Sequence, residues 1–162
     1  MMTSLTPRQT CRNLNGKDTH VFIQTFADRV LVLVTQLGKV GNLIQATLPE
    51  TAPLLPSQQD PSQPNKIQLP EPSPAIQLTP LLGGSPSPHL QDLYSLYASQ
   101  IATIIWTEES KVGLEGIRRG VVVGLALYKQ GGGQEDENAS GEREIFEGVM
   151  EMVYDLLQSG SE

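Results

Sequence analysis

The chain has 162 residues, 38% of them hydrophobic, which suits a single domain with one modest core. Its formal net charge of −7 argues against proteins that grip nucleic acid or an anionic membrane surface through clustered lysine and arginine. We therefore expect neither nucleic acid nor a membrane among its ligands.

The cysteine count and the hydropathy pattern bear on the compartment. The single cysteine, Cys11, allows no internal disulfide and fits a reducing environment. No apolar run approaches the roughly 20 residues of a membrane-spanning helix, and the polar N-terminus lacks the pattern of a signal peptide. These features predict a cytoplasmic protein, with the nucleus as a second compartment.

The first 48 residues predict a four-stranded antiparallel meander. Strands are expected at residues 4–12 and 19–26, joined through Asn15-Gly16, a dipeptide typical of two-residue hairpins. A second tight turn at residues 27–29 leads into the apolar run 30–34. The glycine-bearing turn 37–41 then predicts that the next strand, 42–47, pairs with 30–35 as a hairpin.

The run 30–34 is apolar at every position and consists of valine and leucine. A strand without polar alternation is expected to be covered on both faces. Helices on one side of a small sheet would leave the other side wet, so the run predicts a further layer, which another protein could supply.

Residues 49–74 differ in composition from the rest of the chain, because they hold most of its 12 prolines among serine, glutamine and acidic residues. Such a composition buries too little apolar surface to offset the entropy of ordering. We expect a disordered insertion at 49–74, within one domain that spans residues 1–162.

The next segments predict a fifth strand and a helix. Residues 75–79 alternate in polarity, and Pro80 marks the end of the strand or an edge position. Ser87 is a suitable N-cap and Pro88 a suitable first helical residue. The helix is expected to carry one apolar stripe and to end before a loop at 107–117. The stripe comprises Leu90, Leu93, Tyr94, Tyr97, Ile101, Ile104 and Ile105.

The last third predicts one more strand and a closing helix. Residues 120–128 are apolar on both faces, as in a central strand. A flexible glycine-rich and acidic loop is expected at 131–140, and a helix from about Ser140. The fold class is therefore α+β: about six mostly antiparallel strands in one layer, with two helices packed on one face.

The titratable residues suggest no catalytic centre or metal site. His20 and His89 are the only histidines, and neither has a cysteine or carboxylate at ligand spacing beside it. Cys11 would need a neighbouring base to act as a nucleophile. We expect a protein that is not an enzyme and holds no metal or cofactor. The alternative is a small enzyme that binds a small ligand in a helix–sheet cleft, at a site built from Tyr94, Tyr97 or Trp106.

The apolar surface of the predicted strands is larger than two helices can cover. We expect the second face of the sheet to serve for dimerisation, through two sheets stacked face to face. The alternative is a strongly curved sheet that closes on itself and buries this surface internally.

The segment 30–41, VLVLVTQLGKVG, resembles the central hairpin of the proteasome assembly chaperone 3 family. The resemblance covers most of the chain outside the insertions at 49–74, 107–117 and 131–140, which suggest a fungal or divergent member. It implies a non-catalytic chaperone that assists α-ring formation of the 20S proteasome core particle. It also implies binding to proteasome α-subunits and pairing with a paralogous chaperone or with itself.

The exposed turn after the apolar strand is the expected contact with a partner, because an exposed loop on a rigid hairpin is a common docking point. The predicted partner-binding residues are Thr35, Gln36, Gly38, Lys39 and Gly41. A competing interpretation is a longin- or roadblock-like dimeric adaptor, also a small sheet with helices, that recruits a GTPase or a scaffold.

Overall fold

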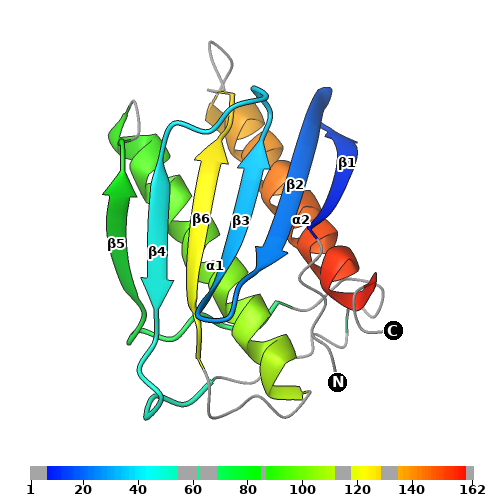
Figure 1. The fold of residues 1–162 in the computed structure, drawn as a ribbon. Coiled ribbons are helices and arrows are strands. Elements are labelled where there is room, and N and C mark those ends of the chain that lie inside the picture. Colours follow the sequence, from blue (N-terminus) through cyan, green and yellow to red (C-terminus); the bar gives the residue numbers. More distant parts are fainter. Residues whose placement is uncertain are drawn as a thin grey trace.

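The computed structural model describes residues 7–54, 62, 69–84, 87–111, 118–128 and 135–159. Six strands and two helices follow one another along the chain (Figure 1). Their bounds are β1 (Arg8–Leu14), β2 (Lys17–Thr25), β3 (Arg29–Thr35), β4 (Leu43–Thr47), β5 (Gln77–Leu82), α1 (Pro88–Lys111), β6 (Gly120–Ala126) and α2 (Glu135–Ser159). The predicted α+β class is confirmed.

The strands form one open sheet in the order β1-β2-β3-β6-β4-β5. All neighbouring pairs are antiparallel except β3 and β6, which run parallel. Because the sheet is open, the alternative of a sheet that closes on itself is wrong. The two strands that are apolar at nearly every position, β3 and β6, lie side by side at its centre, as expected for strands covered on both faces.

The N-terminal hairpin forms as its turn sequence predicts. Asn15 and Gly16 both have positive φ, at 51° and 80°, which a two-residue hairpin turn of the primed type requires. The second predicted turn is also present, since the Phe26 amide donates to the Arg29 carbonyl at 2.8 Å. Strands β1, β2 and β3 therefore form a three-stranded meander.

The predicted hairpin between β3 and β4 is wrong. Strand β6 lies between them, parallel to β3 and antiparallel to β4 (Figure 1). The loop after β3 passes the end of β6 to reach β4, so the four-stranded meander predicted for the first 48 residues stops at β3. Each of β3 and β4 gains hydrogen bonds to β6 instead of to the other.

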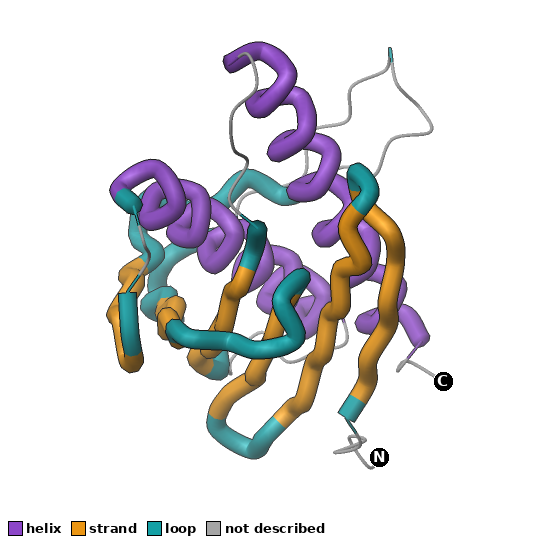
Figure 2. Tube along the Cα trace, turned by 90° about the horizontal axis from the view of Figure 1, so that it is seen from above, coloured by secondary structure: helices purple, strands orange, loops and turns teal. Residues whose placement is uncertain are grey.

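Both helices lie on the same face of the sheet (Figure 2). Helix α1 packs on β4, β5 and β6, helix α2 packs on β1 and β2, and the two helices touch each other. The N-cap is confirmed, because the Ser87 hydroxyl accepts the Leu90 amide at 3.2 Å. The core fills the space between sheet and helices, with Ile23, Val32, Ile101 and Val123 fully buried.

Both helices are longer than their patterns predict. Helix α1 continues to Lys111, so the first residues of the predicted loop 107–117 are helical, supported by an ion pair between Glu108 and Lys111 at 2.9 Å. Helix α2 begins at Glu135, so the part 135–140 of the predicted flexible loop is its first turns. Residues 131–134 lie outside the described ranges.

The two ends of the proline-rich stretch are held against the domain. The guanidinium of Arg118 donates to the carbonyls of Pro49 and Ala52, and the Gln100 amide donates to the Pro70 carbonyl at 2.8 Å. Leu54 and Leu69 pack on the core from these ends. Residues 49–54 and 69–74 of the predicted disordered insertion are thus ordered against the domain, and between them only residue 62 lies within the described ranges.

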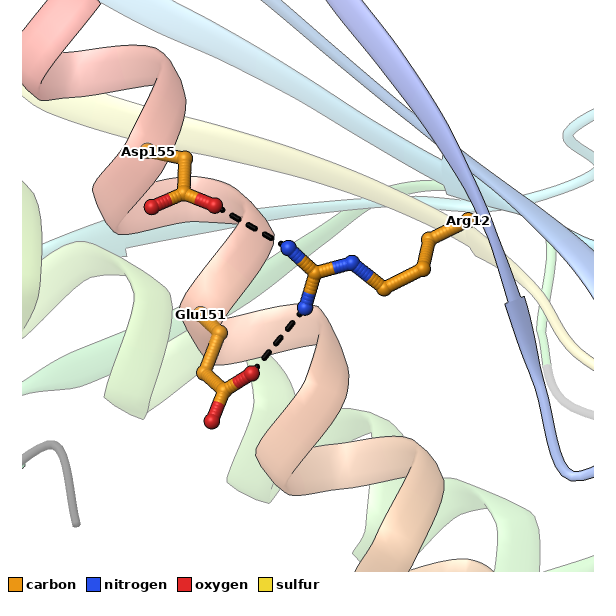
Figure 3. Close-up of polar contacts among 3 residues, drawn as sticks. All are labelled: Arg12, Glu151 and Asp155. Carbon is orange, nitrogen blue, oxygen red and sulfur yellow. Dashed lines mark hydrogen bonds and ion pairs between the residues drawn. The ribbon is translucent and has the colours of Figure 1, made fainter. Parts of the chain in front are cut away.

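Strand β5 forms one edge of the sheet, and Pro80 lies within it rather than at its end. Proline at an edge strand leaves no ladder hydrogen bond unmade, because its outward side has no neighbouring strand. The sheet's other edge, β1, is fixed to α2 by Arg12, whose guanidinium contacts Glu151 and Asp155 at 3.0 Å each (Figure 3).

A partly buried ion pair joins α1 to the base of β6. Arg119 donates to Glu109 and, at 2.8 Å, to the Phe26 carbonyl of the β2–β3 turn. The second oxygen of Glu109, Oε2, is buried without a hydrogen bond. Burial raises the pKa of Glu109, and the charge of Arg119 and its hydrogen bond oppose that rise.

Replacing Arg119 with methionine is expected to lower the free energy of unfolding by about 3 kcal/mol at pH 7, since it leaves a buried carboxylate uncompensated. The pKa of Glu109 should then rise further. A raised folded-state pKa stabilises the protein below the unfolded value of about 4.3, and this stabilisation is lost as pH rises through the folded pKa. Urea unfolding should therefore show a larger deficit at pH 7 than at pH 4. An equal deficit at both values would contradict this role for Glu109.

In the part of the chain that the structure describes, no helix is both long and apolar enough to cross a lipid bilayer.

Candidate protein-binding site

The face of the sheet opposite the helices is named here the outer face. Side chains alternate along each strand, so residues outside the helix-side core identify it. Val121, Val123 and Leu125 belong to that core, whereas Val122 does not. The register places Gln9, Phe22, Leu33 and Gly124 in one row and Gln24, Leu31, Val122 and Gln45 in the next.

The centre of the outer face is apolar and only half covered. Phe22, Leu31, Leu33 and Leu43 are each partly exposed, although they lie on central strands of the sheet. We name these four residues, with Val40 and Val122, the outer-face patch. Val122 is 5% exposed and forms the base of the patch, and Leu82 of β5, paired with Leu43, is 58% exposed at its edge.

Gly124 forms the floor of this patch. A Cβ atom at this position would lie 2.7 Å from Leu33 Cδ2, 2.6 Å from Val40 Cγ1 and 3.1 Å from Leu43 Cδ2. The three side chains therefore converge over the glycine, and the β3–β4 loop reaches across the outer face through Val40. The absence of a side chain at Gly124 is what lets them pack so closely on the sheet.

Charge is distributed unequally between the two sides of the molecule. Among described residues, the outer-face positions of β3, β4 and β6 carry one charged side chain, Arg29 at the start of β3. The helices on the other side carry many charges, such as Glu144, Glu151 and Asp155. An uncharged apolar centre flanked by polar residues, here Gln24 and Gln45, is typical of protein interfaces.

Of the predicted partner-binding residues, Thr35 and Gln36 serve the fold. The Thr35 hydroxyl accepts the Leu37 amide at 3.1 Å and donates to the Lys39 carbonyl at 3.0 Å, which fixes the loop. Gln36 is 8% exposed, donates to Thr19 at 3.1 Å, and accepts the Tyr128 amide at 2.9 Å. The expectation that Gln36 is exposed is therefore wrong, and that Thr35 and Gln36 contact a partner stays a prediction.

Gly38, Lys39 and Gly41 are exposed in the β3–β4 loop, as their prediction requires. Gly38 has a φ of 76°, a left-handed conformation that glycine adopts without strain. The loop thus presents Lys39 from a fixed backbone. That these residues contact a partner stays a prediction.

Replacing Gln36 with leucine is expected to lower the free energy of unfolding by about 1–3 kcal/mol, because it removes two hydrogen bonds and leaves the Tyr128 amide without its partner. Urea denaturation followed by circular dichroism would measure the change. The neighbouring Lys39→Ala variant serves as the control and should stay within about 0.5 kcal/mol of the parent. Equal destabilisation by both changes would contradict the distinction between the two residues.

Two pairs of polar side chains are in contact that the sequence pattern did not predict. Cys11 and His20 are paired across β1 and β2, with Sγ 3.7 Å from Nε2, and His89 Nε2 lies 2.8 Å from Glu142 Oε1. The Asn15-Gly16 turn fixes the register and could have predicted the first pair. Over the described ranges, no three His, Cys, Asp or Glu side chains gather as metal ligands.

The aromatic residues of the alternative small-ligand site belong to the core. Tyr94, Tyr97 and Trp106 are 4%, 1% and 2% exposed. The Tyr94 hydroxyl accepts the Leu127 amide at 3.2 Å, and the Trp106 indole donates to the Arg119 carbonyl at 2.8 Å. Burial, with smaller effects from Glu142 and Tyr94, raises the pKa of Tyr97. These groups stabilise the helix–sheet packing and are not presented to a ligand.

Compared with protein-family models and with curated protein sequences, the chain matches none. Among solved structures, it is similar to one described as the crystal structure of a novel chaperone complex for yeast 20S proteasome assembly. The TM-score is 0.48 at 9% sequence identity, over 91% of this chain and 98% of the other. So low an identity sets no residue correspondence, and the assignment of function rests on the surface of this chain.

Proposed function

We propose that this chain is a non-catalytic chaperone that assists α-ring formation of the 20S proteasome core particle. In this proposal it acts as a dimer with a paralogous chaperone, or with a second copy of itself, in the cytoplasm or nucleus. The observation that carries the proposal is the outer-face patch, an uncharged apolar surface at the centre of an open sheet. Contiguous apolar surface of this kind is typical of protein-binding sites.

A partner sheet stacked on the outer face would cover the patch. Sheets pack face to face at about 10 Å with their side chains interdigitated, and the half-exposed leucines of β3 are spaced for that arrangement. Gln24 and Gln45 flank the patch in the register and would form part of a polar rim. A partner built of the same layers would bring an equivalent surface.

The segment that resembles the assembly chaperones also supplies much of this surface. Residues 30–41 contribute Leu31, Leu33 and Val40 to the outer-face patch and Lys39 to the exposed loop. The resemblance and the geometry therefore point to the same stretch of chain, which supports the assignment to proteasome assembly over other dimeric modules.

Affinity purification of the tagged chain from its own cells, followed by mass spectrometry, tests the proposal. We expect proteasome α-subunits and a second small chaperone, or a second copy of the chain, without mature β-subunits. Recovery of a GTPase or a trafficking scaffold instead would favour the adaptor interpretation and contradict the proposal. A monomer that brings down no protein would contradict it as well.

A further inference from the structure

Most of the described basic residues of this acidic chain are engaged within the molecule. Every described arginine, and Lys111, contacts a carboxylate or a backbone carbonyl of the chain itself. These residues are Arg8, Arg12, Arg29, Lys111, Arg118, Arg119 and Arg143. Among described cations, Lys17 and Lys39 alone have no such contact.

Lys17 and Lys39 lie at the same end of the sheet. Lys17 follows the Asn15-Gly16 turn at the start of β2, and Lys39 lies in the loop after β3 (Figure 1). The Gln36 side-chain amide, three residues before Lys39, donates to the hydroxyl of Thr19, two residues after Lys17, at 3.1 Å. The two lysines are therefore borne by adjacent segments.

Exposed apolar side chains accompany the two lysines. Leu37 is 42% exposed beside Lys39 in the loop, and Tyr128 is 43% exposed after β6. The Lys17 ammonium lies 4.3 Å from the centroid of the Tyr128 ring. We name Lys17, Leu37, Lys39 and Tyr128 the lysine end.

Side-chain hydrogen bonds from neighbouring residues fix the backbone of the lysine end. Gln36 bonds both Thr19 of β2 and the Tyr128 amide, and Thr35 fixes the Leu37–Lys39 turn through its hydroxyl. A surface whose backbone is fixed before binding loses little conformational entropy when a partner docks. The carboxylate of Asp18, the residue after Lys17 in β2, accepts the Asn13 side-chain amide at 3.1 Å.

We infer that the lysine end is a second docking surface, distinct from the outer-face patch, for an acidic segment of a folded protein that also presents an apolar side chain. Two lysines suit one or two carboxylates, and Leu37 and Tyr128 supply the apolar contact. Nucleic acid is a poor match, because it is bound by many cations along successive phosphates and the lysine end offers two. The inference rests on the proposed function, in which the occupant is a proteasome α-subunit.

The test compares two charge-reversed forms of the tagged chain, expressed in its own cells. One is Lys17→Glu with Lys39→Glu, and the matched control is Lys111→Glu with Arg143→Glu, which has the same net charge. Lys111 and Arg143 lie on α1 and α2, and their side chains are 64% and 79% exposed. Recovered α-subunits and recovered partner chaperone are quantified separately.

We expect the lysine variant to keep its partner chaperone while recovery of α-subunits falls about tenfold, and the control to behave as the parent chain. Recovery of α-subunits by the parent should also fall as salt is raised. Undiminished α-subunit recovery by the lysine variant would overturn the inference and leave the proposed function standing. Loss of both proteins would overturn the separation of the two surfaces. A parent chain that recovers no α-subunit would overturn the proposed function, and this inference with it.

Discussion

Replacing Leu33 with aspartate is expected to release the chain from its dimer partner while the chain itself remains folded. Leu33 is partly exposed at the centre of the outer face, between Phe22 and Gly124 in the register. In the monomer the new carboxylate can reach water. In the dimer it would be buried without a partner, which costs at least about 3 kcal/mol and weakens binding by a hundredfold or more.

Light scattering of the purified complex, with circular dichroism of the variant alone, would measure both halves of this prediction. Leu96→Asp is the matched control, because Leu96 is 49% exposed on α1, on the helix side of the molecule. The control should keep the partner. A Leu33→Asp variant that binds as tightly as the parent would contradict docking at the outer face.

Replacing Val123 with aspartate is expected to prevent folding. Val123 is fully buried on β6, paired with Val32 of β3 and Ile44 of β4, and it faces the helices. A carboxylate there has no described cation within reach and no route to solvent. The cost should exceed about 4 kcal/mol, a large part of the roughly 5–15 kcal/mol that stabilises a domain of this size.

Urea unfolding and far-ultraviolet circular dichroism would report the loss for Val123→Asp. The nearly isosteric Val123→Thr variant tests whether charge, and not shape, is responsible. It should fold with a lower midpoint of unfolding. A cooperative unfolding transition for Val123→Asp close to that of the parent would contradict the placement of β6 at the centre of the sheet.

Local signals in the sequence predict the elements of this fold well. The Asn15-Gly16 turn predicts the first hairpin, and Ser87-Pro88 predicts the start of α1, because both depend on residues adjacent in the chain. The apolar stripe of α1 also forms as expected, with all of its members buried except the half-buried Leu93. The strands β3 and β6 are central because their sequences are apolar on both faces.

The pairing of β3 with β6 depends on contacts far apart in the chain, and this is why the sequence pattern failed there. A glycine-bearing turn of the length of residues 36–42 can join two neighbouring strands or pass the end of a third. Which of the two arrangements forms depends on whether the free edge of β3 pairs with β4 or with β6. The pattern of neighbouring residues does not show this, because β6 lies about 80 residues further along the chain.

The candidate site was predictable in part. Two helices cannot cover both faces of a six-stranded sheet, so the sequence predicts an uncovered apolar face. Which residues form that face depends on the register of the strands. Phe22 enters the patch as the cross-strand neighbour of Leu33, and Leu43 as a side chain that packs over Gly124. The sequence also could not reveal that Gln36 is buried, or that Lys17 and Lys39 alone among described cations contact no carboxylate or backbone carbonyl.

A photo-crosslinking amino acid incorporated at position 33 tests most directly that the outer face binds a protein. Its counterpart at position 96, on the opposite side of the molecule, provides the comparison. After irradiation in cells and purification of the tagged chain, we expect position 33 to yield a defined adduct with a small chaperone, or with a second copy of this chain. Position 96 should yield none. Adducts from position 96 alone would contradict the account, because they would place the partner on the helices.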